Sequence, residues 1–144
     1  MSIAPFPHRY VVSLSDDQLV APPRAPITAG APPQFGGSED VWSPEELLVA
    51  SVLLCVRTTF DAYARRDSLE VLDWQGTGTA TLVKGPGGPV FSAIDLDVTL
   101  TTSPGDEARA TELLEKAERL CIITRALQVP VHLHATAKAV PAAS

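Results

Sequence analysis

The chain has 144 residues, 45% of them apolar, and it carries a net charge of −6 with a pI near 4.9. This length predicts one domain over residues 1–144 with a sizeable core. The acidic balance argues against nucleic acid as the main partner, because phosphate binding uses a basic surface. We find no continuous apolar run of the roughly 18 to 20 residues that span a bilayer and no signal-peptide pattern. We therefore expect a cytoplasmic protein without a membrane partner.

The first 42 residues read as short strands interrupted by proline. The segment from His8 to Leu14 alternates weakly between apolar and polar residues, and Asp16-Asp17 is a turn signal. The prolines that follow, between positions 22 and 33, exclude a long central strand or helix.

A helix is predicted from Pro44 to about Arg66. Ser43 fits the N-cap, Pro44 fits the first helical position, and Glu46 completes a Ser-x-x-Glu capping box. The segment contains no further glycine or proline, and its middle is apolar almost all round. This pattern favours a central, buried helix over a peripheral one.

The rest of the chain alternates between strands and one more helix. Two strands are predicted over 69–83 and 90–102, joined by a turn over 84–89, and a last strand over 129–140. Between them, Ser103-Pro104 is expected to open a second helix that carries Cys121. The order of strands, helix, strands, helix and strand predicts an α+β fold.

The chain has only two cysteines, Cys55 and Cys121, each on a predicted helix, and no other residue looks like a catalytic nucleophile. The two thiols could form one redox pair, or each could be a small buried core residue. His132 and His134 share a strand face at a spacing that metal ligands can use. No cluster accompanies them, so exposed strand histidines are the simpler interpretation, and we predict neither a metal nor another cofactor.

The two segments around these cysteines resemble the OsmC and organic hydroperoxide resistance superfamily of thiol peroxidases. The resemblance rests on Ser43-Pro44-Glu45-Glu46-Leu47-Leu48, followed by Cys55, and on Lys116-Ala117-Glu118-Arg119-Leu120-Cys121, together with the order of strands and helices. It implies an intertwined homodimer that reduces organic hydroperoxides or hydrogen peroxide through a reactive cysteine. A dithiol such as a lipoyl group would then restore the enzyme.

Carried over by position, the resemblance makes Cys55 the peroxidatic cysteine, Cys121 the resolving cysteine and Glu45 the active-site glutamate. The family also uses an arginine, held by the glutamate, to stabilise the thiolate. In one branch this arginine precedes a Phe-x-Gly segment, where this chain has Gln34. A second departure is Ile122, where many members carry a proline.

Two arginines precede the first helix and could replace the missing one. We expect Arg24 rather than Arg9 to stabilise the thiolate, because neighbouring prolines limit the freedom of the chain around Arg24. Arg9 lies in the weakly alternating strand and is expected to make a surface contact.

Peroxide chemistry requires a stabilised thiolate, because an ordinary thiol with a pKa near 8.5 is only slightly ionised at pH 7. Cys55 is in the middle of its helix, so the N-terminus of that helix is too distant to help. Glu45 and Cys55 are separated by about 15 Å of helix, so they cannot touch one small group together. A site that uses both therefore favours a second subunit.

These observations lead to one hypothesis and one rival. The hypothesis is a dimeric hydroperoxide reductase in which Cys55 forms a sulfenic acid and then a disulfide with Cys121. The rival is a dimer of the same fold that has lost peroxidase activity and binds a small apolar ligand or a partner, which Gln34 favours.

Overall fold

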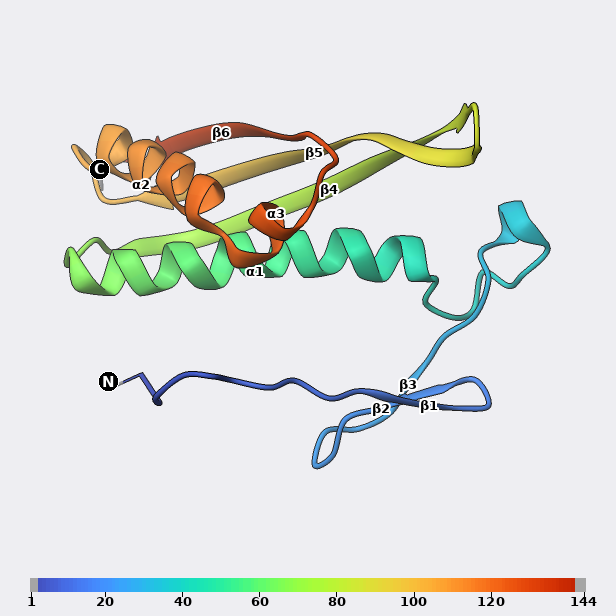
Figure 1. Ribbon diagram of the computed structural model, residues 1–144. Helices are drawn as coiled ribbons and strands as arrows, with labels where there is room; N and C mark the ends of the chain where they lie inside the picture. Colours follow the sequence, from blue (N-terminus) through green and yellow to red (C-terminus); the bar gives the residue numbers. More distant parts are fainter. Residues whose placement is uncertain (1–2, 142–144) are drawn as a thin grey trace. The chain divides into compact units, whose positions relative to one another are not determined.

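The structure is a computed structural model that describes residues 3–141, and it has an α+β fold with two sheets (Figure 1). The chain forms two compact units that divide between Leu47 and Leu48, within the first long helix. The single domain that the chain length suggests stays a prediction.

The first unit contains a small antiparallel sheet of three strands in the order β1-β2-β3 and the 3-10 helix η1. The turn expected at Asp16-Asp17 connects β1 to β2, and Asp16 has a positive φ of 52°. The strand expected from His8 begins only at Ser13. The bounds are β1 Ser13–Ser15, β2 Gln18–Val20, β3 Ile27–Thr28 and η1 Pro33–Phe35.

Helix α1 spans Pro44–Arg66, as predicted, and begins with the predicted capping box. The Glu46 backbone N–H donates to Ser43 Oγ at 3.1 Å, and the Ser43 backbone N–H donates to Glu46 Oε1 at 3.2 Å. These bonds satisfy two of the free donors at the start of the helix. Glu46 therefore has a structural role.

The second unit is built on a three-stranded sheet in the order β4-β5-β6. Strands β4 and β5 form an antiparallel hairpin, and β6 runs parallel to β5. The hairpin turn is shorter than predicted, because both strands extend up to Pro86-Gly87, and the last strand is also shorter than predicted. The bounds are β4 Val71–Gly85, β5 Gly88–Thr102 and β6 Val131–Ala139.

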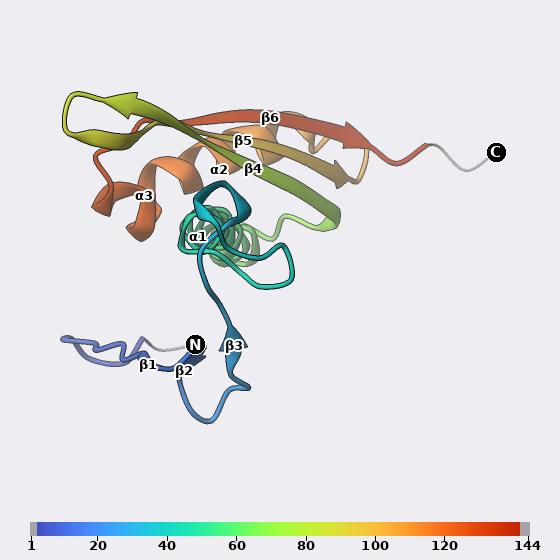
Figure 2. The same cartoon turned by 90° about the vertical axis from the view of Figure 1, so that its right-hand side faces the viewer.

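Helices α1 and α2 cover the same face of this sheet and share one core (Figures 1 and 2). The alternation predicted for β5 is present, since Ile94, Leu96, Val98 and Leu100 are all buried. The central, buried position predicted for α1 holds for one face of the helix, whereas Leu54 on another face is 64% exposed. The buried residues of α1 repeat every four positions: Val52, Val56, Phe60 and Ala64.

The second helix differs from the sequence prediction at both ends. Helix α2 spans Glu107–Leu120 rather than starting at Ser103-Pro104, because Gly105 adopts a φ of 95° and breaks the backbone just before it. Cys121 does not lie on α2. It occupies an extended position, with φ −59° and ψ 126°, between α2 and the short helix α3, Ile122–Ala126.

Two glycines of β4 allow close packing on the inner face of the sheet. A Cβ at Gly78 would lie 2.6 Å from Val49 Cγ1, and a Cβ at Gly76 would lie 2.3 Å from the Trp74 ring. Both separations are shorter than van der Waals contact. The absence of a side chain therefore brings α1 against β4 at the level of Val49.

By length and composition, α1 would also qualify as a membrane-spanning helix, with a mean hydropathy of 1.5 over 18 residues. Charged and polar residues interrupt the apolar run of this helix in the sequence. Core helices of globular units share these properties, and α1 packs its buried face into the core of the sheet.

Candidate active site

Cys55 lies on α1, one helical turn before Thr59, and its side chain is partly buried. It packs against the core cluster that contains Cys121, and Ile123 packs against the same cluster. Both thiols are free. The fold thus brings together the two cysteines that the sequence singled out, although they are 66 positions apart in the chain.

The surroundings of Cys55 favour its ionised form. Burial raises the pKa of the Cys55 thiol, but hydrogen bonds from Cys121, from the Ile123 and Ile122 backbone and from Thr59 together lower it below the ordinary value. The helix that supplies the backbone groups is α3, not α1. Nothing in the sequence signals this source, because α3 is far from Cys55 along the chain.

The second thiol has the opposite tendency. Cys121 has no exposed surface, and burial together with its hydrogen bond to Cys55 raises the pKa of the Cys121 thiol. Its Sγ also accepts a hydrogen bond from the Thr124 backbone N–H at 3.5 Å, which makes Cys121 the N-cap of α3. The surroundings of the pair therefore favour ionisation of Cys55 over ionisation of Cys121.

No arginine is among the groups that shift the pKa of Cys55 in the described part of the chain. Arg57 is only two residues away, but its Nε donates to Asp61 at 2.9 Å and its guanidinium lies over the Trp74 ring. Residues two apart on a helix point in different directions. Arg57 is therefore part of the packing around Trp74.

The remaining predicted site residues lie in the first unit. Arg24 is exposed, and its Nη1 donates to the Ala21 carbonyl oxygen at 3.2 Å. Arg9 and Gln34 are also exposed. Glu45 Oε2 is buried and has no hydrogen-bond partner among residues 3–141. Burying a carboxylate oxygen without a hydrogen-bond partner costs folding free energy. This oxygen could therefore accept a hydrogen bond from a donor that the described residues do not supply.

His132 and His134 lie on the exposed face of β6, as predicted. Their ring nitrogens approach the same oxygen of Asp95, at 3.3 and 3.8 Å. Within residues 3–141, no group of three or more histidine, cysteine, aspartate or glutamate side chains is arranged to hold a metal ion.

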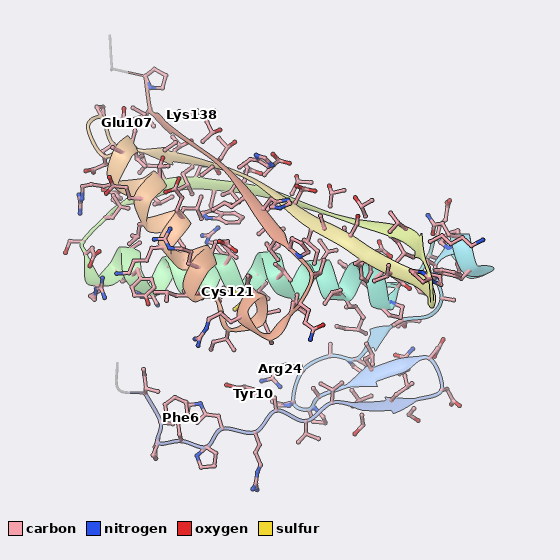
Figure 3. The ribbon with its side chains drawn as sticks, turned by 45° about the horizontal axis from the view of Figure 1, so that its top comes forward. Phe6, Tyr10, Arg24, Glu107, Cys121 and Lys138 are labelled. Carbon is pink, nitrogen blue, oxygen red and sulfur yellow. The ribbon has the colours of Figure 1, made fainter. Side chains whose placement is uncertain are left out.

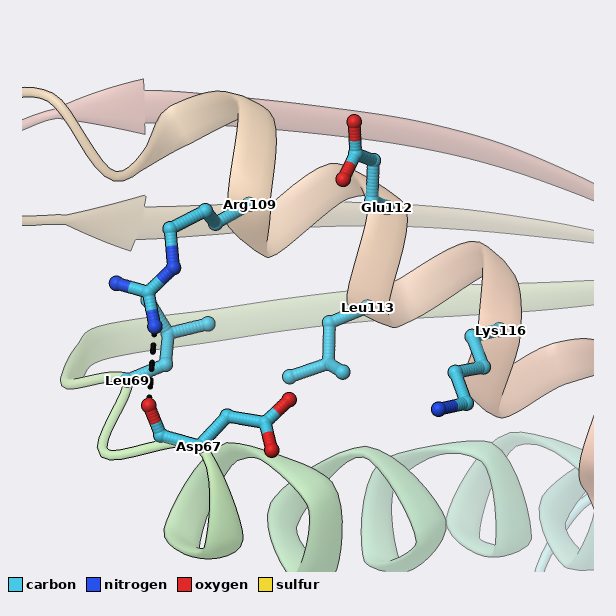
Figure 4. Close-up of a pocket in the computed structure, with 6 residues that line it drawn as sticks. All are labelled: Asp67, Leu69, Arg109, Glu112, Leu113 and Lys116. Carbon is cyan, nitrogen blue, oxygen red and sulfur yellow. Dashed lines mark hydrogen bonds between the residues drawn. The ribbon is translucent and has the colours of Figure 1, made fainter.

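A pocket of about 240 Å³ lies between the end of α1 and α2, lined by none of the predicted site residues (Figure 4). Arg109 closes one end, because it donates to the Asp67 carbonyl oxygen at 2.9 Å and pairs with Asp106 at 2.9 Å. The bond to Asp67 connects the end of α1 to α2, and the pair with Asp106 lies within the start of α2. The lining is Asp67, Leu69, Arg109, Glu112, Leu113 and Lys116.

Comparison with known families identifies the architecture that carries this cysteine pair. The profile of the OsmC-like protein family matches residues 37–135, which include both cysteines and Glu45. The chain belongs to the OsmC-like family. No curated protein matches the sequence.

Solved structures of OsmC-like proteins share the fold at low sequence identity. An OsmC-like protein from Mycoplasma pneumoniae is 17% identical to this chain, with a TM-score of 0.77. The match covers 92% of this chain and 99% of the Mycoplasma chain. An organic hydroperoxide resistance protein OsmC from Legionella pneumophila is 16% identical, with a TM-score of 0.70. The match covers 94% of this chain and 99% of the Legionella chain. A putative organic hydroperoxide resistance protein from Vibrio cholerae, with captopril bound in one of its active sites, is 16% identical with a TM-score of 0.68, at coverages of 90% and 91%.

The opposite pKa shifts of the two thiols predict an order of reaction with an alkylating agent. Between pH 7 and 8 we expect iodoacetamide to modify Cys55 well before Cys121, because only the thiolate reacts and the lowered pKa of Cys55 makes it ionise at lower pH. Peptide mass spectrometry after short exposures measures both sites separately. Equal rates for the two thiols at pH 7 would contradict the assignment.

Proposed function

We propose that this OsmC-like protein is a cysteine-based hydroperoxide reductase. The observation that carries the proposal is the pairing of Cys55, whose pKa is lowered, with the buried thiol of Cys121, whose pKa is raised. A peroxidase of this kind needs a reactive thiolate and a second thiol within reach of the oxidised sulfur. The only two cysteines of the chain would supply both groups.

In the proposed cycle, the Cys55 thiolate attacks the distal oxygen of the hydroperoxide. The O–O bond breaks, the alkoxide takes a proton from solvent and leaves as an alcohol, and Cys55 becomes a sulfenic acid. The Cys121 sulfur then attacks the Cys55 sulfur. Its thiol proton and the sulfenic hydroxyl leave as water, and a disulfide remains.

Two electrons from an external dithiol complete the cycle. One thiolate of the reductant attacks the disulfide, and its second thiol releases the mixed disulfide, so both cysteines return to thiols. A lipoyl group fits this requirement as a dithiol. A reducing compartment such as the cytoplasm would keep that reductant available.

The rival hypothesis is a protein of this fold that binds a small apolar ligand or partner without reducing peroxide. The observation that favours it is the lack of an arginine among the groups that act on Cys55 in the described residues. The two hypotheses differ in whether Cys55 reacts with peroxide.

Replacing each cysteine separately tests the catalytic cycle. We expect Cys55→Ser to lower hydroperoxide consumption to the rate of buffer, because the nucleophile is lost. Cys121→Ala should still consume one equivalent of hydroperoxide, because its Cys55 can form the sulfenic acid but not the disulfide. Consumption of cumene hydroperoxide and trapping of the sulfenic acid with a 1,3-dione measure both steps.

Wild-type protein treated with one equivalent of hydroperoxide provides the control for this pair of variants. Peptide mapping should find a disulfide between Cys55 and Cys121 within one chain. Unmodified thiols in the wild type would exclude the reductase and favour the apolar-ligand hypothesis.

We also propose a homodimer. Six large apolar side chains of the N-terminal segment are 63–88% exposed, and Leu54 and Ile122, which neighbour the cysteine pair in sequence, are 64% and 74% exposed. Several large apolar side chains exposed within one short segment are consistent with an interaction surface. The six N-terminal residues are Ile3, Phe6, Tyr10, Val11, Val12 and Leu14.

Sedimentation at low micromolar concentration tests the homodimer. We expect twice the chain mass of 15.2 kDa for the wild type and a shift towards monomer for Tyr10→Glu, because a buried carboxylate would oppose association. Glu115→Gln, on the exposed side of α2, is the matched control and should keep the wild-type mass. A wild-type monomer would remove the argument for a shared site.

Arg24 is proposed to complete the site together with Glu45. The buried, unpartnered Oε2 of Glu45 could accept from a guanidinium, and an arginine so placed would bring positive charge towards a thiolate. Because Glu45 and Cys55 are about 15 Å apart on one helix, this arrangement requires an extended arginine or a second subunit.

Replacing the two N-terminal arginines in turn tests this assignment. We expect Arg24→Met to raise the pKa of Cys55 and to slow hydroperoxide reduction by about tenfold, the effect of losing one charge-assisted interaction. Arg9→Met is the matched control and should have little effect. The pH dependence of Cys55 alkylation and the peroxide rate are the measurements, and an unchanged Arg24→Met would show the assignment to be wrong.

A further inference from the structure

The pocket between the end of α1 and α2 combines an apolar floor with charged sides (Figure 4). Leu69 and Leu113 form the floor, since they are only 7% and 8% exposed and belong to the core cluster. The volume of about 240 Å³ lies below the roughly 300 to 1,000 Å³ of pockets that hold drug-sized ligands. The space therefore suits a smaller molecule, and all of its lining comes from the second unit.

Asp67 supplies a negative charge to the pocket. Its Oδ1 accepts a hydrogen bond from Arg66 Nε at 2.8 Å. This hydrogen bond lowers the pKa of the Asp67 carboxyl, and the positive charges of Lys116 and Arg109 lower that pKa further. Asp67 is therefore a carboxylate at pH 7, and its two oxygens have room for a donor besides Arg66.

Lys116 supplies a positive charge that no carboxylate pairs with among residues 3–141. Its Nζ lies 4.8 Å from the centroid of the Tyr63 ring. A cation–π contact of this kind holds the ammonium group in place but leaves N–H groups for an acceptor. In Figure 4 the Asp67 carboxylate and the Lys116 side chain are directed towards one another, whereas the Glu112 carboxylate points away from both.

The charges of the lining restrict the class of ligand. Two carboxylates and two cationic side chains line the pocket, so their charges cancel. Asp67 would repel a simple anion, and Lys116 and Arg109 would repel a simple cation. A molecule that carries both charges close together, with an apolar group attached, matches the two facing side chains and the apolar floor at once.

We propose that this pocket binds a free α-amino acid with an apolar side chain. The ammonium group of the ligand donates to Asp67, its carboxylate accepts from Lys116, and its side chain covers the two leucines of the floor. Arg109 is engaged by Asp106 and the Asp67 carbonyl oxygen, so it bounds the pocket without holding the ligand. The inference is independent of the reaction proposed for the two cysteines.

Three molecules with the same apolar group test the proposal on the wild-type protein. L-Leucine carries both charges, isocaproate carries only the carboxylate, and isoamylamine carries only the ammonium group. Each is titrated while the amide resonances of the protein are followed by NMR. Because only the ligand changes, this comparison decides the proposal without any variant.

We expect L-leucine to shift the resonances of the pocket residues along a saturable curve. The Kd should be on the order of 1 mM, because partly exposed ion pairs contribute little. Isocaproate and isoamylamine should each bind about tenfold more weakly, since each lacks one charge-assisted interaction. Equal Kd values for the three molecules, a titration without saturation, or shifts confined to other elements overturn the proposal.

Two lysine variants then test where the carboxylate of L-leucine binds. Lys116→Met removes the ammonium group and keeps an apolar side chain, so it should weaken L-leucine binding about tenfold. Lys138→Met is the matched control, because it removes the same charge from an exposed position on β6 (Figure 3) and should bind as the wild type does. An unchanged Kd in Lys116→Met, or equal losses in both variants, overturns the proposal.

Discussion

The interruption of the helical chain at Cys121 is the constraint on which the candidate site depends. A continuous helix from Glu107 to Ala126 would pair the N–H groups of residues 122 and 123 with carbonyl groups four positions earlier. Because Cys121 is extended, those donors are free and its own sulfur caps the next helix at Thr124. Burial of Cys121 in the core then fixes this junction against α1, where Cys55 lies.

The elements with strong local signals could be predicted from the sequence, and those decided by tertiary contacts could not. The capping box at Ser43 indicates where α1 begins. The alternation of apolar residues in β5 indicates which face of that strand is buried. Gly105 and Cys121 lack such a signal. A proline after serine suggested the start of α2, but the positive φ of Gly105 delayed it, and nothing in the residue pattern around Cys121 indicates a helix break.

The candidate site could be predicted as a pair of residues but not as an electrostatic environment. The sequence identifies two cysteines, and their proximity follows once both pack into one core. The groups that lower the pKa of Cys55 include backbone N–H groups, which every residue type except proline possesses. A search for a cationic side chain therefore misses them, and only the path of the backbone reveals them.

The two sulfurs share a hydrogen bond, so the groups around them decide which becomes the thiolate. Their interaction lowers one pKa and raises the other, as expected for a coupled pair. Full burial opposes charge on Cys121, whereas Cys55 is only partly buried and is the sulfur towards which the Ile122 and Ile123 donors act. In the proposed reaction, the order of nucleophile and resolving thiol would follow from the unequal burial and hydrogen bonding of two otherwise identical side chains.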